Sequence, residues 1–175
     1  MIENRDAEQF FWDDPTVRYL ADVAARFEFP CALCAPFLGM ELVKRGVKTR
    51  VLDSDERFSH LAGFEIYDLR RPRYLNENFG VIFCDPPFWS VSLRELLAAI
   101  RVLARYDSSQ NLAICFPTRR AAALLRVFAE FGLKPSGFFP KYRSVEDTAR
   151  NEIEFFANFE WDLAPRSRPT DSSAR

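Results

Sequence analysis

The stretch Val81-Ile-Phe-Cys-Asp-Pro-Pro-Phe88 decides how the rest of this sequence is interpreted. Its first four residues are all apolar, which is typical of a strand that is buried on both faces. The strand has to end at Asp85, because a proline cannot donate to a strand ladder and two prolines in succession cannot freely begin a helix. A buried strand that ends abruptly in a carboxylate and two prolines is the most unusual feature of the chain.

Strand and helix patterns alternate on both sides of this stretch. Helices are predicted at Asp14, as an N-cap ahead of Pro15, and at the Ser92-x-x-Glu95 capping box. Further strands are predicted at residues 31–34, 49–53, 64–67 and 112–116. This alternation favours an α/β fold, in which a mostly parallel sheet carries helices on both faces.

The last third of the sequence departs from this alternation. Residues 136–142 and 152–160 are both strand-like, so we expect them to pair antiparallel at the edge of the sheet. Residues 164–175 contain Pro, Ser, Arg and Asp but no large apolar residue, and we expect them to be disordered. In a chain of 175 residues, the preceding residues 1–163 are predicted to form one domain.

The composition excludes several kinds of chemistry. His60 is the only histidine, which rules out a multi-histidine zinc site. The 6 glycines are isolated from one another, and therefore no glycine-rich phosphate loop exists. Cys31 and Cys34 form a C-x-x-C without a second ligand pair, so buried strand cysteines are the favoured interpretation.

Charge and hydropathy narrow the choice of partners and of location. Lys and Arg number 24 against 25 Asp and Glu, which leaves a formal net charge of -1 and no sequence-wide attraction to nucleic acid or anionic lipid. No run approaches the roughly 18 apolar residues of a membrane span, and the polar N-terminus has no signal-peptide core. We therefore expect a cytoplasmic protein without a membrane partner, in which any contact to nucleic acid comes from a local patch.

Four carboxylates follow predicted strands, namely Asp53, Asp55, Asp68 and Asp85. In an open parallel sheet these strand ends share one rim, where ligands bind. A carboxylate after the second strand can accept both hydroxyl protons of a ribose, and Asp53 fits that role. Asp is also favoured as a turn residue, so a purely structural role for the first three stays open.

The Asp85-Pro86-Pro87-Phe88 turn has the chemistry of a receptor for a planar amine. The Asp85 carboxylate and a backbone carbonyl can accept the two amine hydrogens, while the prolines remove competing N–H donors. Phe88 offers a ring face for stacking or for a cation–π contact. An amine held in this way is a nucleophile. Its matching electrophile is the activated methyl group of S-adenosylmethionine, and no metal is needed.

An ordered set of motifs resembles the family named N6-adenine methyltransferase-like. Within it, Asp85 to Phe88 is similar to motif IV of amino-N-methyltransferases. The motifs that carry the resemblance are Gln9 to Trp12, Ala35-Pro36, Leu52 to Phe58, Tyr67-Asp68, Asp85 to Phe88, Pro140-Lys141 and Asn151-Glu152. The family includes lysine methyltransferases that act on a translation elongation factor and a zinc-knuckle enzyme that acts on adenine in ribosomal RNA.

The resemblance implies a Rossmann-like, S-adenosylmethionine-dependent methyltransferase with a seven-stranded, mostly parallel sheet and an antiparallel C-terminal strand. It assigns the catalytic amine pocket to Asp85, Pro86, Pro87 and Phe88. It assigns cofactor binding to Asp53, Asp55 and Asp68, with Ala35 and Pro36 in place of the usual glycine-rich loop. It places the acceptor against Phe11, Trp12, Phe88, Trp89, Asn151 and Glu152.

Three functions stay open. The first is methyl transfer to the exocyclic N6 amine of adenine in RNA or DNA, for which the base must be flipped out or unpaired. The second is methyl transfer to a lysine of a translation factor, whose amine must first lose a proton. The near-neutral net charge and the lack of an added nucleic-acid module favour lysine, whereas the family name and the shape of the motif favour adenine. The third is a non-catalytic binding module, which the missing glycine loop suggests.

Overall fold

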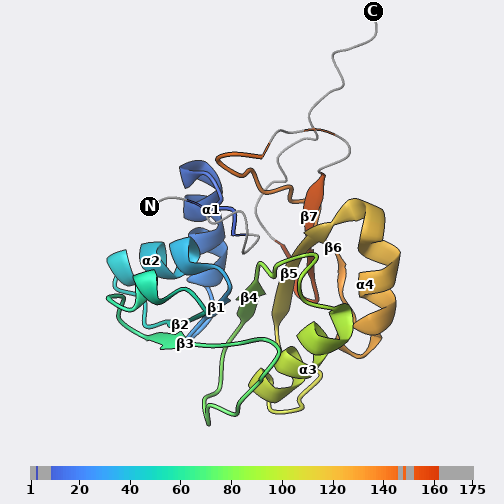
Figure 1. Ribbon diagram of the computed structural model, residues 1–175, viewed down its shortest axis with the longest axis horizontal. Coiled ribbons are helices and arrows are strands. Elements are labelled where there is room, and N and C mark those ends of the chain that lie inside the picture. The colour runs from blue at the N-terminus through green and yellow to red at the C-terminus, as the bar shows by residue number, and fades with distance from the viewer. Residues whose placement is uncertain (1–2, 4–8, 146–147, 149–151, 162–175) are drawn as a thin grey trace, which may run out of the picture.

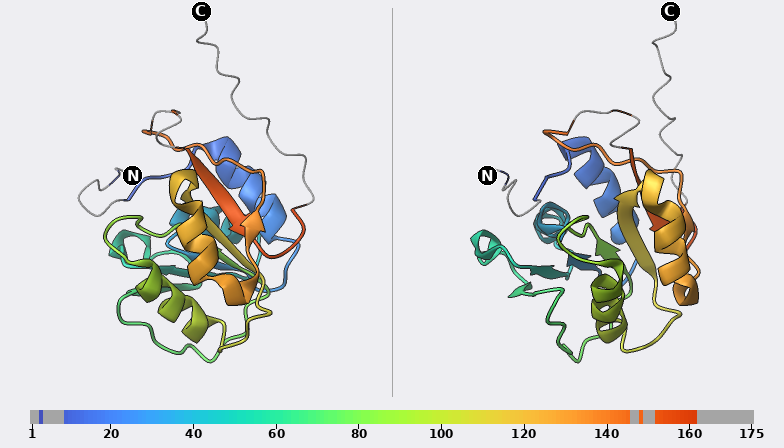
Figure 2. Two further views of the ribbon diagram at one scale, coloured as in Figure 1. Left: turned by 90° about the vertical axis from the view of Figure 1, so that its right-hand side faces the viewer. Right: turned by 45° about the vertical axis from the view of Figure 1, so that its right-hand side comes forward.

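The computed structural model describes residues 3, 9–145, 148 and 152–161, and these residues form three layers (Figure 1 and Figure 2). The sheet lies in the middle, with α1 (Asp14–Ala24) and α2 (Pro36–Lys44) on one face. The other face is covered by α3 (Leu93–Leu103) and α4 (Ala121–Val127). The predicted tail at 164–175 lies outside the described residues.

The strands of the described chain form a 7-stranded sheet in the order β3-β2-β1-β4-β5-β7-β6. The first five strands pair in parallel, and β7 pairs antiparallel with both β5 and β6. This confirms the predicted sheet. The order reverses between β1 and β4, where sheets of this kind bind ligands. The strands are β1 (Cys31–Leu33), β2 (Arg50–Asp53), β3 (Phe64–Ile66), β4 (Ile82–Cys84), β5 (Leu112–Pro117), β6 (Lys134–Pro135) and β7 (Ile153–Ala157), and the short 3-10 turns are η2 (Glu56–Phe58), η3 (Thr118–Arg120) and η4 (Ala129–Phe131).

Side chains alternate between two hydrophobic cores along the central strands. Ile82, Cys84 and Ile114 pack in the core beneath α3 and α4. Phe83 and Cys115 pack in the core beneath α1 and α2. Because both faces are covered, these strands need apolar side chains at every position, as in other buried parallel sheets. The four cysteines are free thiols, and all but the partly buried Cys34 are fully buried, in agreement with the prediction.

Side-chain caps set the start of α1 and of α3. The predicted box at α3 is present, with Glu95 N donating to Ser92 Oγ over 3.2 Å and Ser92 N donating to Glu95 Oε2 over 2.8 Å. The predicted cap of α1 was wrong by one residue, because Asp13, not Asp14, accepts from Thr16 N over 2.8 Å. Both positions hold Asp, and Pro15 is tolerated anywhere in the first turn, so the sequence does not distinguish the two registers.

The predicted pairing of residues 136–142 with 152–160 is only partly correct. On its outer side β7 pairs with β6, which is shorter than the predicted strand and begins earlier. It ends at Pro135, and Gly137 then has a φ of 75°, so a regular ladder does not continue. Further along, Tyr142 forms an isolated antiparallel bridge with Trp12. The segment after β6 thus keeps two backbone hydrogen bonds to β7, from Ser136 N to Phe155 O and from Phe155 N to Phe138 O, each over 3.0 Å, before it joins the N-terminal segment.

Gly80, just before β4, has no room for a side chain. A Cβ at this position would lie 2.1 Å from the backbone oxygen of Glu28. Gly80→Ala should therefore lower the free energy of unfolding by about 3 kcal/mol, measured by urea denaturation. Gly46→Ala is the matched control, because Gly46 has a φ of 75° but open space around it, and about 1 kcal/mol is expected. Equal losses in the two variants would contradict the close approach to Glu28.

Two features are missing from the part of the chain that the structure describes. Each of its helices is too short or too polar to span a membrane. No cluster of three or more His, Cys, Asp or Glu side chains within it could hold a metal ion.

Candidate active site

A cavity lies at the carboxyl ends of the parallel strands, beside the reversal of strand order. Its volume is about 340 Å³, within the roughly 300–1,000 Å³ that is usual for small-molecule sites. The predicted residues on its wall are Phe11, Pro36, Asp53, Asp55, Asp68, Asp85, Pro86, Pro87 and Phe88. One cavity thus brings together the predicted amine pocket and most of the predicted cofactor residues.

Asp53 ends β2 and is a buried carboxylate on the cavity wall. Burial raises the pKa of Asp53 to about 6. The backbone N–H of Asp55 opposes this shift, because it donates to Asp53 Oδ1 over 2.9 Å. The group is therefore mainly ionised at neutral pH and can accept hydroxyl hydrogens from a ligand.

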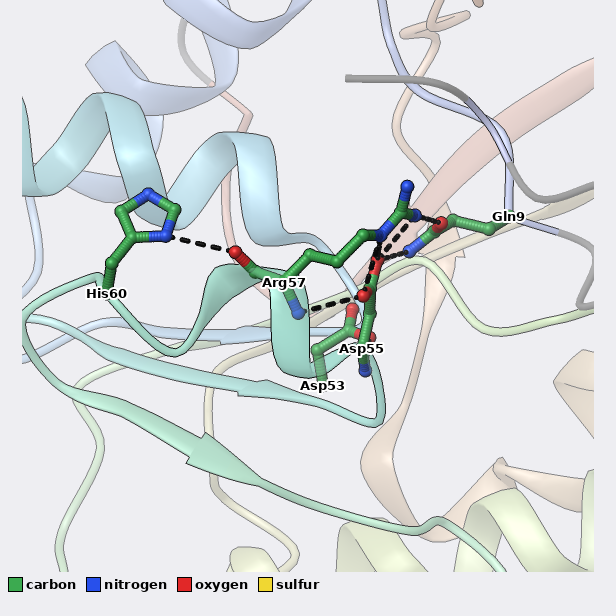
Figure 3. Close-up of polar contacts among 5 residues, drawn as sticks. All are labelled: Gln9, Asp53, Asp55, Arg57 and His60. Atoms are coloured by element: carbon green, nitrogen blue, oxygen red, sulfur yellow. Dashed lines mark hydrogen bonds and ion pairs between the residues drawn. The ribbon is translucent and has the colours of Figure 1, made fainter.

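Asp55 lines the cavity and is hydrogen-bonded to the N-terminal segment through its side chain (Figure 3). Its Oδ2 accepts from Arg57 Nη2 over 2.7 Å and from Gln9 Nε2 over 2.8 Å. Arg57 Nη2 also donates to Gln9 Oε1 over 2.6 Å, which closes a triangle of three side chains. Hydrogen bonds from Arg57 and Gln9 lower the pKa of Asp55. Asp55 therefore positions the segment that carries Phe11, besides lining the cavity itself.

The loop after β1 bends at Cys34. This residue has a φ of 54° and donates its N–H to Leu52 O over 2.8 Å. Glycine is the usual residue in this left-handed backbone conformation, so Cys34 takes a position that would favour glycine. Pro36 begins α2 and lines the cavity, whereas Ala35 is buried behind it and is not on the cavity wall.

Asp85 follows β4 and is held by a residue 57 positions later in the chain. Tyr142 Oη donates to Asp85 Oδ1 over 2.8 Å, and Cys115 Sγ lies 3.3 Å from the same Oη. Burial raises the pKa of Asp85 to about 8, although the hydrogen bonds from Tyr142 and Cys115 oppose the shift. The carboxylate is therefore a pre-oriented hydrogen-bond acceptor on the cavity wall, and its charge is sensitive to pH near 8.

Residues 3–161 match a family model described as probable N6-adenine methyltransferase, which is nearly all of the 175-residue chain. The chain belongs to this family. It is accordingly a methyltransferase. No curated protein sequence matches it.

Several solved structures share the fold of this methyltransferase at low sequence identity. The magnesium protoporphyrin IX methyltransferase from Synechocystis, solved with bound S-adenosylmethionine, is 16% identical, covers 83% of this chain and 76% of its own, and has a TM-score of 0.55. The methyltransferase domain of the bacterial CtHen1-CN is 11% identical, covers 82% of this chain and 98% of its own, and has a TM-score of 0.53. These likenesses confirm the predicted Rossmann-like methyltransferase fold.

Three predicted acceptor residues of the methyltransferase are described but do not line the cavity. Trp12 is only 2% exposed, and its ring packs on those of Tyr142 and Phe155 at centroid distances of 6.4 and 5.6 Å. Trp12 therefore supports Tyr142 from behind. Trp89 lies exposed directly after Phe88, and the backbone oxygen of Glu152 accepts from Thr118 N over 3.0 Å. The fourth, Asn151, lies outside the described residues.

Cys34, Arg57 and Tyr142 belong to this site or support it, but they were not predicted as site residues. Arg57 stands two positions after Asp55 within the motif Leu52 to Phe58, and that spacing could have indicated an ion pair. Cys34 could have been suspected from the missing glycine after the first strand. Tyr142 had no comparable signal, because only the tertiary structure places it beside Asp85.

Tyr142→Phe is expected to shift the pH dependence of methyl transfer. The Tyr142 hydroxyl favours the ionised form of Asp85, so its removal should raise the pKa of Asp85 above about 8. We expect kcat to rise with pH as Asp85 ionises, and the midpoint of this rise should move to higher pH in Tyr142→Phe. Activity near pH 7.5 should fall about 10-fold and recover in more alkaline buffer. Tyr106→Phe, at an exposed tyrosine, is the control. An unchanged midpoint in Tyr142→Phe would show that this hydrogen bond does not tune Asp85.

Proposed function

We propose that this methyltransferase acts on the exocyclic N6 amine of adenine in RNA or DNA. The observation that carries the proposal is Asp85, whose oriented carboxylate lies on the wall of the cavity beside the Pro86-Pro87-Phe88 turn. A planar aromatic amine needs two acceptors for its hydrogens and a flat surface for its ring. The turn offers both kinds of group. The description of the family supports the same acceptor.

The cavity suits S-adenosylmethionine in size and in the groups it presents. Asp53, at the end of β2, would accept hydrogen bonds from the two ribose hydroxyls. Asp68, which follows β3, lines the same cavity. Tyr67, Leu69 and Val91 supply apolar wall for a purine ring. When bound, S-adenosylmethionine supplies a methyl group on a positively charged sulfur, and that sulfur keeps the electron pair of the broken S–C bond.

The residues of the chain then act on the acceptor amine. Asp85 accepts one amine hydrogen, and a carbonyl of the diproline turn accepts the other. Both bonds keep the nitrogen lone pair on nitrogen instead of in the ring, so that it can form the new N–C bond. Phe88 holds the plane of the base in the direction that this attack requires. The methylated nitrogen releases one proton, which passes to Asp85 or to water.

The acceptor is identified by methyl transfer from radiolabelled S-adenosylmethionine to defined substrates. Single-stranded RNA and DNA oligonucleotides with one adenine are compared with total protein, and each reaction is split by nuclease or protease. We expect label in the nuclease-sensitive fraction, recovered as N6-methylated adenine nucleoside, and none with Asp85→Ala. An oligonucleotide with purine in place of adenine lacks the amine and should accept no label. Label confined to methylated lysine in the protease-sensitive fraction would contradict the adenine proposal.

A further inference from the structure

Trp89 is a large aromatic side chain on the surface, at the edge of the acceptor pocket. It is 65% exposed, whereas its neighbour Phe88 lines the cavity. Most of the large aromatic side chains of the described chain are buried in the two cores or pack against them. This exposed indole, directly beside the active-site turn, is not part of either hydrophobic core.

Two arginines of η3, the short turn that follows β5, lie against this indole. The guanidinium carbons of Arg119 and Arg120 are 5.2 and 5.1 Å from the centroid of the Trp89 ring. Arg120 also donates from Nη1 to Phe88 O over 2.6 Å and lies 5.0 Å from the ring of Phe116. The Phe88-Trp89 turn is thus held in place by η3, so the exposed indole has a defined position.

A third arginine, Arg70, contacts the same turn. Arg70 lines the cavity, and its Nη2 donates to Ser90 O. Glu95 is the acidic group near this side, where its pKa is lowered mainly by bonds to Ser92 and less by the charge of Arg70. Three guanidinium groups and one indole therefore gather at residues 88–90, beside the cavity, in a chain whose formal net charge is only -1.

This combination is the one by which proteins bind single-stranded nucleic acid. Aromatic rings and guanidinium planes stack on bases without regard to their identity, and the positive charges contact phosphates. An adenine whose amine reaches Asp85 has left its stack, and its neighbours in the strand then expose their own faces. Trp89 directly follows Phe88, so its Cα atom lies about 3.8 Å from that of the residue proposed to meet the target base.

We propose that Trp89, with Arg119 and Arg120, forms a stacking platform for the nucleotide next to the target adenine. The proposal rests on the proposed adenine acceptor and names its substrate class as a single-stranded segment of RNA or DNA. In this arrangement Phe88 receives the target base, the platform receives its neighbour, and Arg119 contacts the phosphate backbone. The platform contributes substrate affinity, whereas Asp85 contributes chemistry.

Trp89→Ala separates these contributions. We expect the KM for a single-stranded oligonucleotide to rise about 10-fold or more, with kcat and the Kd of S-adenosylmethionine changed much less. Trp89→Phe should restore most of the affinity, because a phenyl ring also stacks. Tyr106→Ala is the matched control, since Tyr106 is 75% exposed and is not part of the cavity wall. An unchanged KM in Trp89→Ala would overturn the platform.

An altered substrate tests the contact directly. Abasic nucleotides on both sides of the adenine should weaken binding to the unmodified protein by about the factor that Trp89→Ala costs. Combining Trp89→Ala with the abasic substrate should then add no further loss. If the affinity losses from the variant and from the abasic substrate instead multiplied in full, the indole and the neighbouring base would not interact. That result would overturn the proposal.

The phosphate contact has its own measurement. Arg119→Ala should reduce the slope of log K against log salt concentration by about 0.7, the value for one phosphate of a single strand. Arg126→Ala, at an exposed arginine on α4, should leave the slope as it is. Equal slopes in Arg119→Ala and in the unmodified protein would overturn the assigned phosphate contact.

The two proposals fail in different ways. If the protein methylates an oligonucleotide and Trp89→Ala does so with the same KM, the platform is wrong and the adenine acceptor stands. If methyl groups are transferred only to protein, both the adenine acceptor and the platform are wrong.

Discussion

Asp85→Ala is expected to lower kcat for methyl transfer by about 100- to 1,000-fold, with a much smaller change in cofactor affinity. Asp85 is the oriented acceptor on the cavity wall, and removal of one pre-oriented hydrogen-bonding group from an active site typically has an effect of this size. Single-turnover transfer of a radiolabelled methyl group measures kcat, and calorimetry measures cofactor binding. Turnover equal to that of the unmodified protein would show that Asp85 does not contact the acceptor.

Asp85→Asn provides the matched variant, because an amide keeps the shape and one acceptor oxygen but cannot ionise. The kcat of the unmodified protein should rise with pH and level off above the pKa of about 8, since the ionised carboxylate is the stronger acceptor. In Asp85→Asn this rise should disappear, leaving a low and flat profile. A rise of the same size in the variant would mean that another group titrates.

The same ionisation affects stability with the opposite sign. The pKa of Asp85 is raised from 3.8 to about 8, so between these values the folded protein holds a proton that the unfolded chain has released. The stabilisation is fully present below pH 3.8 and is lost as the pH rises through about 8. Urea unfolding at a series of pH values should therefore show a smaller decline for Asp85→Asn than for the unmodified protein.

Asp53→Ala is expected to raise the Kd of S-adenosylmethionine by about 10- to 100-fold. Loss of hydrogen bonds from a ligand to a charged group costs about 1.5–3 kcal/mol, and at least one ribose hydroxyl would lose its acceptor. Because burial raises the pKa of Asp53 to about 6, the affinity of the unmodified protein should also weaken as the pH falls through that value. Isothermal titration calorimetry at pH 5 to 8 measures both effects.

Glu130→Ala is the control for Asp53→Ala, since Glu130 is an exposed carboxylate that pairs with Arg101 outside the cavity wall. Its affinity for the cofactor should match that of the unmodified protein at every pH. If Asp53→Ala bound the cofactor equally well, the ribose would have to be held by another residue of the wall.

Much of the fold could be predicted because its signals are local. The apolar run at β4 identifies a doubly buried strand by itself, and the Ser92–Glu95 box identifies the start of α3 within four residues. Predictions failed where neighbouring residues were equivalent or where a turn interrupted a pattern. Asp13 and Asp14 are chemically identical as caps, and β6 ends at Pro135 although the apolar pattern continues beyond it.

The candidate site likewise contains residues that could be predicted from the sequence and residues that could not. Asp53, Asp68 and Asp85 could be predicted because each follows an apolar strand, and parallel strands place their carboxyl ends on one rim. Trp12 was predicted to contact the acceptor but is instead buried behind Tyr142. Aromatic composition alone does not distinguish a residue of a pocket from a residue of the core, since both environments favour large rings.

The sequence by itself determined the alternating α/β architecture, the rim of strand-end carboxylates and the Asp-Pro-Pro-Phe turn, because each depends on residues that are close together in the chain. Only the tertiary structure decided how those groups are held. Tyr142 orients Asp85 from 57 residues away, and Gln9 meets Asp55 across 46 residues. Arg119 and Arg120 lie against Trp89 in the same way. These contacts depend on which loops the packed sheet brings together, and on hydrogen bonds that buried polar groups must find wherever a partner lies.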